Sequence, residues 1–198
     1  MRYRPGGKVR RRKRKMIRPL TRLDDPLWPT LVALYEASFD RDSREPLERL
    51  ESEVEGSYRL PFQFLVDEQD GKLRGFARWC DLGYAAFLLH LATDPECRGE
   101  GIGATLVNAI LAKSERMILE ADDEDERLMR FYGRFGGRIL TPTYTQLSLH
   151  EDTEPVPYAL LGIGDFPDPQ TTVESFYRDV WELPPDDPYV RKAVGGIL

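Results

Sequence analysis

The chain has 198 residues, of which 41% are hydrophobic, and no apolar run reaches membrane-spanning length. This composition excludes a membrane-spanning class and predicts a soluble protein whose single domain is long enough to bury a core. Cys80 and Cys97 are too few for a disulfide framework, which favours a reducing cytoplasm. His90 and His150 lack zinc-ligand spacing, so no metal site is expected.

Charge is distributed unevenly along the chain. Residues 1–18 contain ten Lys or Arg and no acid, which leaves 18 of the 28 basic residues against 34 acidic residues in the remainder. Residues 1–15 cannot form a core and are predicted to be a disordered tail. A nucleic-acid contact through this tail stays open, but Tyr3 is its only aromatic residue, which favours a solvated extension.

The first segment beyond the tail carries one strand signal and two helix signals. Residues 16–20 predict a strand, and Asp24-Asp25-Pro26 predicts a cap with proline in the first helical turn. Ser43 is the predicted cap of a second, short helix, whose apolar residues recur at helical spacing through position 54. The order expected here is therefore strand, helix, helix.

Three further strands are predicted at 61–67, 72–81 and 85–93. The Asp-Gly pair at 70–71 predicts a tight hairpin between the first two strands, because both residue types tolerate the backbone of a two-residue turn. The near-continuous apolar stretch at 88–91 is typical of a central strand that is covered on both faces.

A glycine-rich loop follows these strands and opens the next predicted helix, 101–116. Gly99, Gly101 and Gly103 stand at alternate positions, so no side chain keeps an anion from the main chain there. The helix N-terminus adds its positive end at the same place. The spacing differs from the dinucleotide pattern and lacks the Lys-Ser/Thr of nucleotide-triphosphate loops. The loop therefore predicts a cradle for the pyrophosphate of a different carrier.

A second motif follows the strand predicted at 117–121. The helix predicted at 124–135 carries the pair Phe131-Tyr132 and ends before Gly136. In this order the two motifs resemble the GNAT superfamily of acyl-CoA-dependent N-acyltransferases, over roughly residues 16–150. The first family signature, Arg/Gln-x-x-Gly-x-Gly/Ala, is matched by Arg98, Gly101 and Gly103.

The resemblance implies a single α/β domain at 16–165 with a mixed, mainly antiparallel six- to seven-stranded sheet flanked by helices. It also implies acetyl-CoA as cosubstrate and acetyl transfer to a primary amine of a small molecule or peptide, by direct attack in a ternary complex. In the family the fourth strand splays from the fifth and the gap receives the pantetheine arm; an ordinary strand ladder is the alternative. The acyl-CoA contacts implied by motif position are Leu91, Ala92, Thr93, Arg98, Gly99, Glu100, Gly101, Ile102, Gly103, Ala104, Asp125 and Phe131.

Two catalytic candidates follow from the resemblance. Tyr132 matches the family tyrosine that lies near the thioester sulfur, although its helical spacing also fits plain core packing. Glu120 precedes Tyr132 by twelve positions, a spacing similar to that of a base and acid pair in the protein N-terminal acetyltransferase branch. The alternative for Glu120 is an edge carboxylate paired with Arg116 or Arg138. Asp125 departs from the Asn that the family often has at its position.

The last part of the chain also predicts structure. Strands are expected at 138–149 and 156–162, and a capping box at 171–174 predicts a helix in the segment 166–198. An apolar face on this helix is expected to pack on the domain, to meet a partner subunit in a homodimer, or to cover the substrate cleft. The residues of this face are Val173, Phe176, Tyr177, Val180 and Trp181.

Two other function classes stay open at this point. A non-catalytic acyl-CoA-binding module would bind the cofactor without releasing thiol, and a nucleic-acid-associated protein would bind RNA through residues 1–15 with steep salt dependence. The amine acceptor is not encoded legibly. The residue types that could line its site are Tyr58, Tyr144, His150 and Tyr158.

Overall fold

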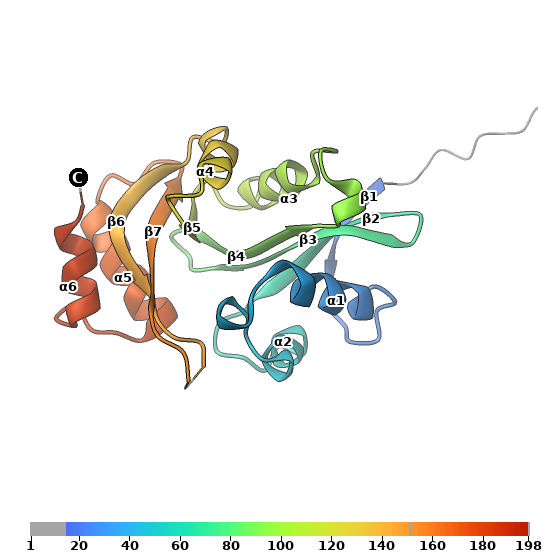
Figure 1. Cartoon of the computed structure of the whole chain (residues 1–198), viewed down its shortest axis with the longest axis horizontal. Helices are drawn as coiled ribbons and strands as arrows, with labels where there is room; N and C mark the ends of the chain where they lie inside the picture. Colours follow the sequence, from blue (N-terminus) through green and yellow to red (C-terminus); the bar gives the residue numbers. More distant parts are fainter. Residues whose placement is uncertain (1–14, 151, 198) are drawn as a thin grey trace, which may run out of the picture.

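The computed structural model describes residues 15–150 and 152–197 (Figure 1). All of the predicted tail except Lys15 therefore lies outside the described residues. One sheet has the strand order β1-β2-β3-β4-β5-β7-β6, which confirms the predicted fold class. The strands are β1 Lys15–Leu20, β2 Gln63–Gln69, β3 Lys72–Asp81, β4 Ala86–Thr93, β5 Met117–Ala121, β6 Arg138–Gln146 and β7 Val156–Ile163.

Helices cover both faces of the sheet (Figure 1). One face carries α3 (Ile102–Leu111) and α4 (Glu126–Gly133), which pack on alternate residues of the central strands. The opposite face carries α1 (Trp28–Ser38) and α2 (Leu47–Val54) over β1 to β4. It also carries α5 (Pro169–Trp181) and α6 (Pro188–Gly195) over the β6–β7 end. Short 3-10 helices lie at Arg41–Ser43 (η1) and Pro95–Cys97 (η2). Within the described residues, none of the helices has the length and apolar character needed to cross a bilayer.

Among the described strands, β4 and β5 are the one parallel pair, and their pairing is short. Residues 86–88 of β4 pair with residues 117–119 of β5, and the pairing ends there. Beyond Leu88, β4 continues along β3 to Thr93, with Leu89 left as an extra residue in a bulge. The strands therefore diverge on the β5 side, as the family resemblance implies.

Several predicted boundaries are wrong, each for a local reason. The helix predicted at 101–116 ends at Leu111, and Ser43 lies in η1 rather than capping α2, which begins after Pro46. The capping box at 171–174 is also wrong, because Asp168 is the cap: its carboxylate accepts a hydrogen bond of 3.0 Å from the Thr171 N–H. Proline at the first position of α5 moves the start upstream.

The chain after α5 contains a helix that the sequence analysis missed. The proline-rich segment at 184–188 does end α5, but Asp187 then caps α6, with its carboxylate accepting from the Tyr189 N–H at 2.8 Å. Thr141 and Thr143 of β6 donate to the carbonyls of Ala193 and Lys192, at 2.6 and 2.9 Å. The C-terminal helix pair is therefore docked on β6 of the same chain.

Candidate active site

The loop between β4 and α3 exposes its backbone, as the glycine spacing predicts. Gly99 and Gly101 have φ values of 82° and 78°, a left-handed conformation that favours glycine. A Cβ at either position would have no described heavy atom within 4 Å, beyond its own chain neighbours. Gly101 is also the N-cap of α3, whose first turn has no acidic residue to offset the helix dipole. The loop thus fits a pyrophosphate.

Three predicted acyl-CoA residues from separate elements meet beside this loop. A Cβ on Gly103 would lie 3.4 Å from Cζ of Phe131 in α4 and 3.7 Å from Cδ2 of Leu91 in β4. The ring of Phe131 lies edge to face with the ring of Tyr132, with centroids 4.9 Å apart. The structure therefore brings Gly103, Leu91, Phe131 and Tyr132 together, between α3 and α4.

Two of the predicted contact residues have side chains that are already engaged. Glu100 accepts a hydrogen bond of 2.8 Å from Nη2 of Arg74, so its carboxylate braces the loop against β3. Asp125 caps α4, because its Oδ1 accepts from the N–H groups of Arg127 and Leu128 at 2.9 and 3.0 Å. Both side chains therefore stabilise the loop or helix on which they lie.

Tyr132 combines a buried ring with a free hydroxyl. The residue is 5% exposed and packs in the core between α3, α4 and the sheet, which raises the pKa of the phenol. No described residue forms a hydrogen bond with its hydroxyl. The side-chain oxygens that are buried from solvent and also lack a partner belong to Asp67, Tyr84 and Thr145, so the Tyr132 oxygen is not one of them. The Tyr132 hydroxyl therefore reaches accessible space.

Glu120 lies on the opposite face of the sheet from Tyr132. Tyr144 of β6 donates a short hydrogen bond to its Oε1, and Nε1 of Trp181 donates to the Tyr144 oxygen at 2.7 Å. Burial raises the pKa of Glu120 to about 7; the Tyr144 hydrogen bond opposes this shift and the charge of Glu45 adds to it. The expected alternative, pairing with Arg116 or Arg138, is wrong.

A buried charge cluster, which the sequence analysis missed, lies on the same face as Glu120. Arg78 of β3 is fully buried; its Nε donates to Glu53 at 2.8 Å and its Nη2 donates to Glu45. Its Nη1 lies 3.1 Å from Nδ1 of His90. Because arginine cannot accept, Nδ1 accepts and the His90 proton sits on Nε2, which donates to the Ser43 carbonyl at 3.0 Å.

This cluster has two consequences. Burial and the Arg78 charge lower the pKa of His90 to about 3, so the ring stays neutral. The bonds from His90 to Ser43 and from Arg78 to Glu45 also hold the segment between α1 and α2 on the central strands. Spacing in the sequence gave no signal for it, because its members come from α2, the segment before α2, β3 and β4.

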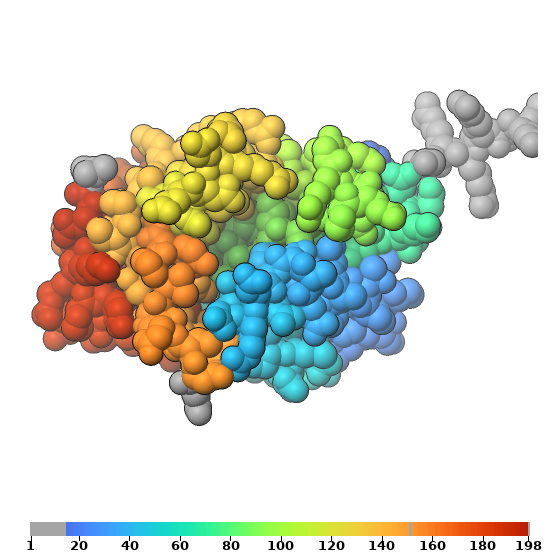
Figure 2. All heavy atoms as spheres, viewed as in Figure 1, coloured from blue at the N-terminus to red at the C-terminus, as the bar shows by residue number. Residues whose placement is uncertain are grey.

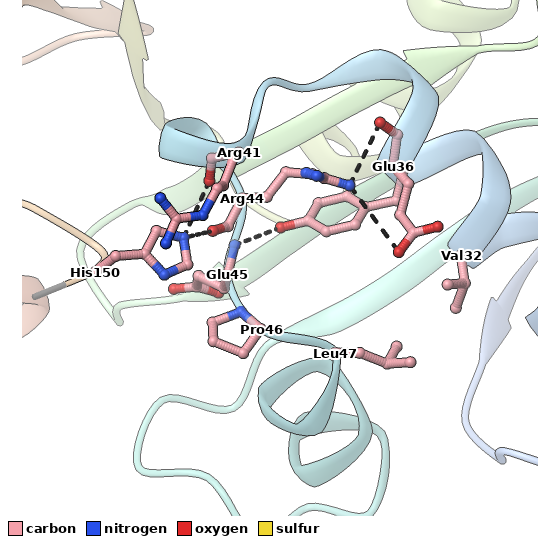
Figure 3. Close-up of a pocket in the computed structure, with 9 residues that line it drawn as sticks. Val32, Glu36, Arg41, Arg44, Glu45, Pro46, Leu47 and His150 are labelled. Atoms are coloured by element: carbon pink, nitrogen blue, oxygen red, sulfur yellow. Dashed lines mark hydrogen bonds and ion pairs between the residues drawn. The ribbon is translucent and has the colours of Figure 1, made fainter. Parts of the chain in front are cut away.

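A pocket of about 180 Å³ lies where the segment between α1 and α2 meets the β6–β7 hairpin (Figure 3). His150 of the hairpin points at the η1 segment, with Nε2 at 2.7 Å from the carbonyl oxygen of Arg44 and 3.0 Å from that of Arg41. Arg41 also pairs with Asp152 at 2.9 Å. The lining residues are Val32, Tyr35, Glu36, Arg41, Arg44, Glu45, Pro46, Leu47 and His150.

The four residues considered for the acceptor site lie in different surroundings. His150 lines this pocket, and Tyr144 is bonded to Glu120. Tyr58 lies under the Arg49 guanidinium at 4.1 Å, and Tyr158 is partly buried against the core beneath α5. Figure 2 shows the surface hollowed between α4 (yellow), the hairpin (orange) and the segment between α1 and α2 (blue), with green sheet residues at its floor.

Comparisons with known proteins place this geometry in a family. Residues 28–137 match the acetyltransferase (GNAT) family, whereas no curated protein matches the chain. A solved GNAT-family protein from Bacteroides thetaiotaomicron has a TM-score of 0.73 at 20% identity, covering 85% of this chain and 99% of its own. An acetyltransferase-like protein of Salmonella typhimurium, solved with its cofactor acetyl-CoA, has a TM-score of 0.55 at 16% identity, covering 78% and 98%.

A third solved structure is Arabidopsis thaliana Naa50 in complex with the bisubstrate analogue CoA-Ac-MVNAL. Its TM-score is 0.54 at 18% identity, and the similarity covers 76% of this chain and 99% of that one. The family match spans more than half of the present chain. GNAT enzymes use acetyl-CoA as cosubstrate, and the loop from Gly99 to Gly103 fits its pyrophosphate. This chain belongs to the acetyltransferase (GNAT) family.

Proposed function

We propose that the chain transfers an acetyl group from acetyl-CoA to a primary amine of a small molecule or peptide, by direct attack in a ternary complex. One observation carries the proposal: β4 and β5 diverge beside the glycine loop, with Tyr132 on one face of the sheet and Glu120 on the other. Bound acetyl-CoA supplies an activated thioester. The protein then needs an acceptor for the amine proton and a donor for the leaving sulfur.

Backbone groups are proposed to hold the cofactor. The amides from Gly99 to Ala104 surround the open face of the loop and the positive end of α3. Residues 91–93 of β4 pair with β3 on one side only, so the edge facing β5 offers unpaired backbone groups. These groups match the amides of a pantetheine arm.

Glu120 is proposed as the base that takes the amine proton, directly or through water. Its pKa of about 7 leaves much of the carboxylate ionised at neutral pH, yet keeps it more basic than an ordinary glutamate. Among the described residues, Tyr144 is the sole hydrogen-bond partner of this carboxylate, so Oε2 is unengaged. The acceptor would then approach from the face that carries Glu45 and the pocket at His150.

Tyr132 is proposed to hydrogen-bond the leaving sulfur. Full proton transfer is unfavourable, because burial raises the pKa of the phenol above its ordinary 10, whereas a thiol titrates near ~8.5. A hydrogen bond to the developing thiolate avoids this cost and acts only as charge appears. The free hydroxyl of Tyr132 supports this role.

The test combines binding and turnover. Calorimetry with acetyl-CoA is expected to show binding, and a thiol-release assay across small-molecule and peptide amines is expected to identify at least one acceptor. Binding without thiol release across the panel would identify a non-catalytic acyl-CoA module. RNA binding that is steeply salt-dependent and lost on deletion of residues 1–15, without acetyl-CoA binding, would support the nucleic-acid alternative.

A further inference from the structure

We propose that Trp181 and Tyr144 form a positioning relay through which the C-terminal helix α5 orients the Glu120 carboxylate for proton abstraction. The relay joins three elements, α5, β6 and β5. All of α5 lies beyond the 28–137 region that matches the family, so the relay adds to the family domain from outside it. The inference rests on the proposed function, in which Glu120 is the base.

Hydrogen-bond chemistry fixes the direction of the relay. The indole N–H of Trp181 can only donate, and it donates to the Tyr144 oxygen at 2.7 Å. The Tyr144 hydroxyl has one proton, and it points this proton at Oε1 of Glu120. The indole N–H polarises the phenol toward the carboxylate, so each bond strengthens the next. The favoured state at the end of the relay is the ionised carboxylate.

Packing against α5 restricts Tyr144 to this geometry. Tyr144 is 1% exposed, and its ring lies 5.8 Å from that of Phe176 and 5.1 Å from that of Tyr177, measured between centroids. The Tyr177 hydroxyl also accepts from the Thr145 N–H and donates to the Thr145 carbonyl, at 3.0 and 3.1 Å. The helix therefore clamps β6 at the residue next to Tyr144.

The relay leaves the two carboxylate oxygens with different roles. Tyr144 holds Oε1, so the side chain cannot rotate freely, while Oε2 stays available for the proton of an amine or water. Two ionisable groups of neighbouring elements shift the pKa of Glu120, namely Tyr144 of β6 and Glu45 after η1, and the charge of Glu120 in turn raises the pKa of Tyr177 of α5. Of these, only Tyr144 donates a hydrogen bond to the carboxylate within the described chain.

Two conservative variants test the relay, with a third as control. Tyr144→Phe removes the donor to Glu120, and Trp181→Phe removes the indole N–H while keeping an aromatic ring in place. Tyr84→Phe removes a buried hydroxyl that packs against the same core and has no hydrogen-bond partner among the described residues. The measurements are the acid limb of the pH profile of kcat/KM and, separately, a carbon-13 NMR titration of labelled glutamate. The Glu120 resonance is the one missing from Glu120→Gln.

Loss of a donor to the charged form should raise the pKa of Glu120. We expect an upward shift of about one unit in Tyr144→Phe, a smaller shift in the same direction in Trp181→Phe, and none in Tyr84→Phe. If Tyr144→Phe does not fold, Trp181→Phe decides alone. A Glu120 resonance that titrates identically in the relay variants and the control overturns the inference. The NMR titration needs no turnover, so inactivity of the wild type would refute the proposed function separately.

Discussion

Glu120 of β5 and Tyr132 of α4 lie on opposite faces of the sheet. Tyr132 packs with α3 and α4, on the face to which Leu119 and Ala121 of β5 also point. Glu120 alternates with these residues and accepts from Tyr144, which belongs to the core under α5. A proton cannot pass directly between the two side chains, so in the proposed reaction one acts at the leaving sulfur and the other at the acceptor amine.

The role of Tyr132 predicts a rate defect without a binding defect. Tyr132→Phe should lower kcat by about 10- to 100-fold, the effect of losing one hydrogen bond to a developing charge, and leave acetyl-CoA affinity near that of the wild type. Tyr84→Phe is the control, because it removes a buried hydroxyl that has no described partner. Wild-type turnover of Tyr132→Phe would assign the residue to packing alone.

A side chain placed in the glycine loop is predicted to block acetyl-CoA binding by its bulk. The backbone strain that it also causes is matched by a control variant. Gly101→Val should abolish acetyl-CoA binding, as measured by calorimetry, because the side chain would occupy the open face of the loop. Gly71 in the β2–β3 hairpin has φ of 80° and equally open surroundings. Gly71→Val should therefore lose similar stability, about 1–2 kcal/mol, and keep its affinity. A folded Gly101→Val protein with unchanged affinity would contradict the loop assignment.

The environment of Glu120 predicts a stability that depends on pH. Its folded pKa of about 7 lies above the ordinary 4.5, so the folded state binds the proton more tightly and loses stability as pH rises from 4.5 through 7. Glu120→Gln should therefore raise stability at pH 8 by on the order of 1–3 kcal/mol and leave it unchanged at pH 4, while abolishing turnover. Thermal unfolding at both pH values measures this. Equal stability differences at both would contradict the raised pKa.

His90 predicts the opposite pH dependence. Its pKa is about 3 in the folded state and ordinarily 6.5, so the unfolded state binds the proton first and stability falls as pH drops from 6.5 toward 3. The loss should reach about 2–3 kcal/mol at pH 4.5. His90→Gln should remove it, because the amide oxygen can accept from Arg78 without titrating. Denaturant unfolding at pH 7.5 and 4.5 compares the two proteins; parallel losses would refute the prediction.

The docking of α5 predicts which of its side chains stabilise the fold. Val173, Phe176 and Tyr177 are fully buried, whereas Trp181 is half-buried, so Trp181 contributes less buried apolar area than its size allows. Phe176→Ala should cost about 3–5 kcal/mol and Trp181→Ala clearly less, by denaturant unfolding. Sedimentation should show the same mass for both variants as for the wild type. A Trp181→Ala cost equal to that of Phe176→Ala would contradict this ranking.

Local patterns in the sequence were sufficient for the strand signals, the glycine loop and the position of Glu120 in β5. Each of these depends on a period of two or 3.6 residues, or on the backbone freedom of glycine, and so is encoded within a short window. Helix boundaries were less certain, because prolines at 169 and 188 shift the caps to Asp168 and Asp187. The resemblance to the family, rather than any local pattern, predicted the cofactor and the divergence of β4 from β5.

Tertiary structure alone decided what surrounds Glu120. Tyr144 lies 24 residues away on β6, and β7 separates β6 from β5 in the sheet, so no local pattern brings the two residues together. The partners of Arg78 are likewise set by how α2 and the segment before it pack on the sheet. Burial sets the proton affinity of Glu120 and His90, and burial depends on which distant segments cover a side chain. The sequence therefore identified the candidate base, and the packing of α5 and β6 determined its chemistry.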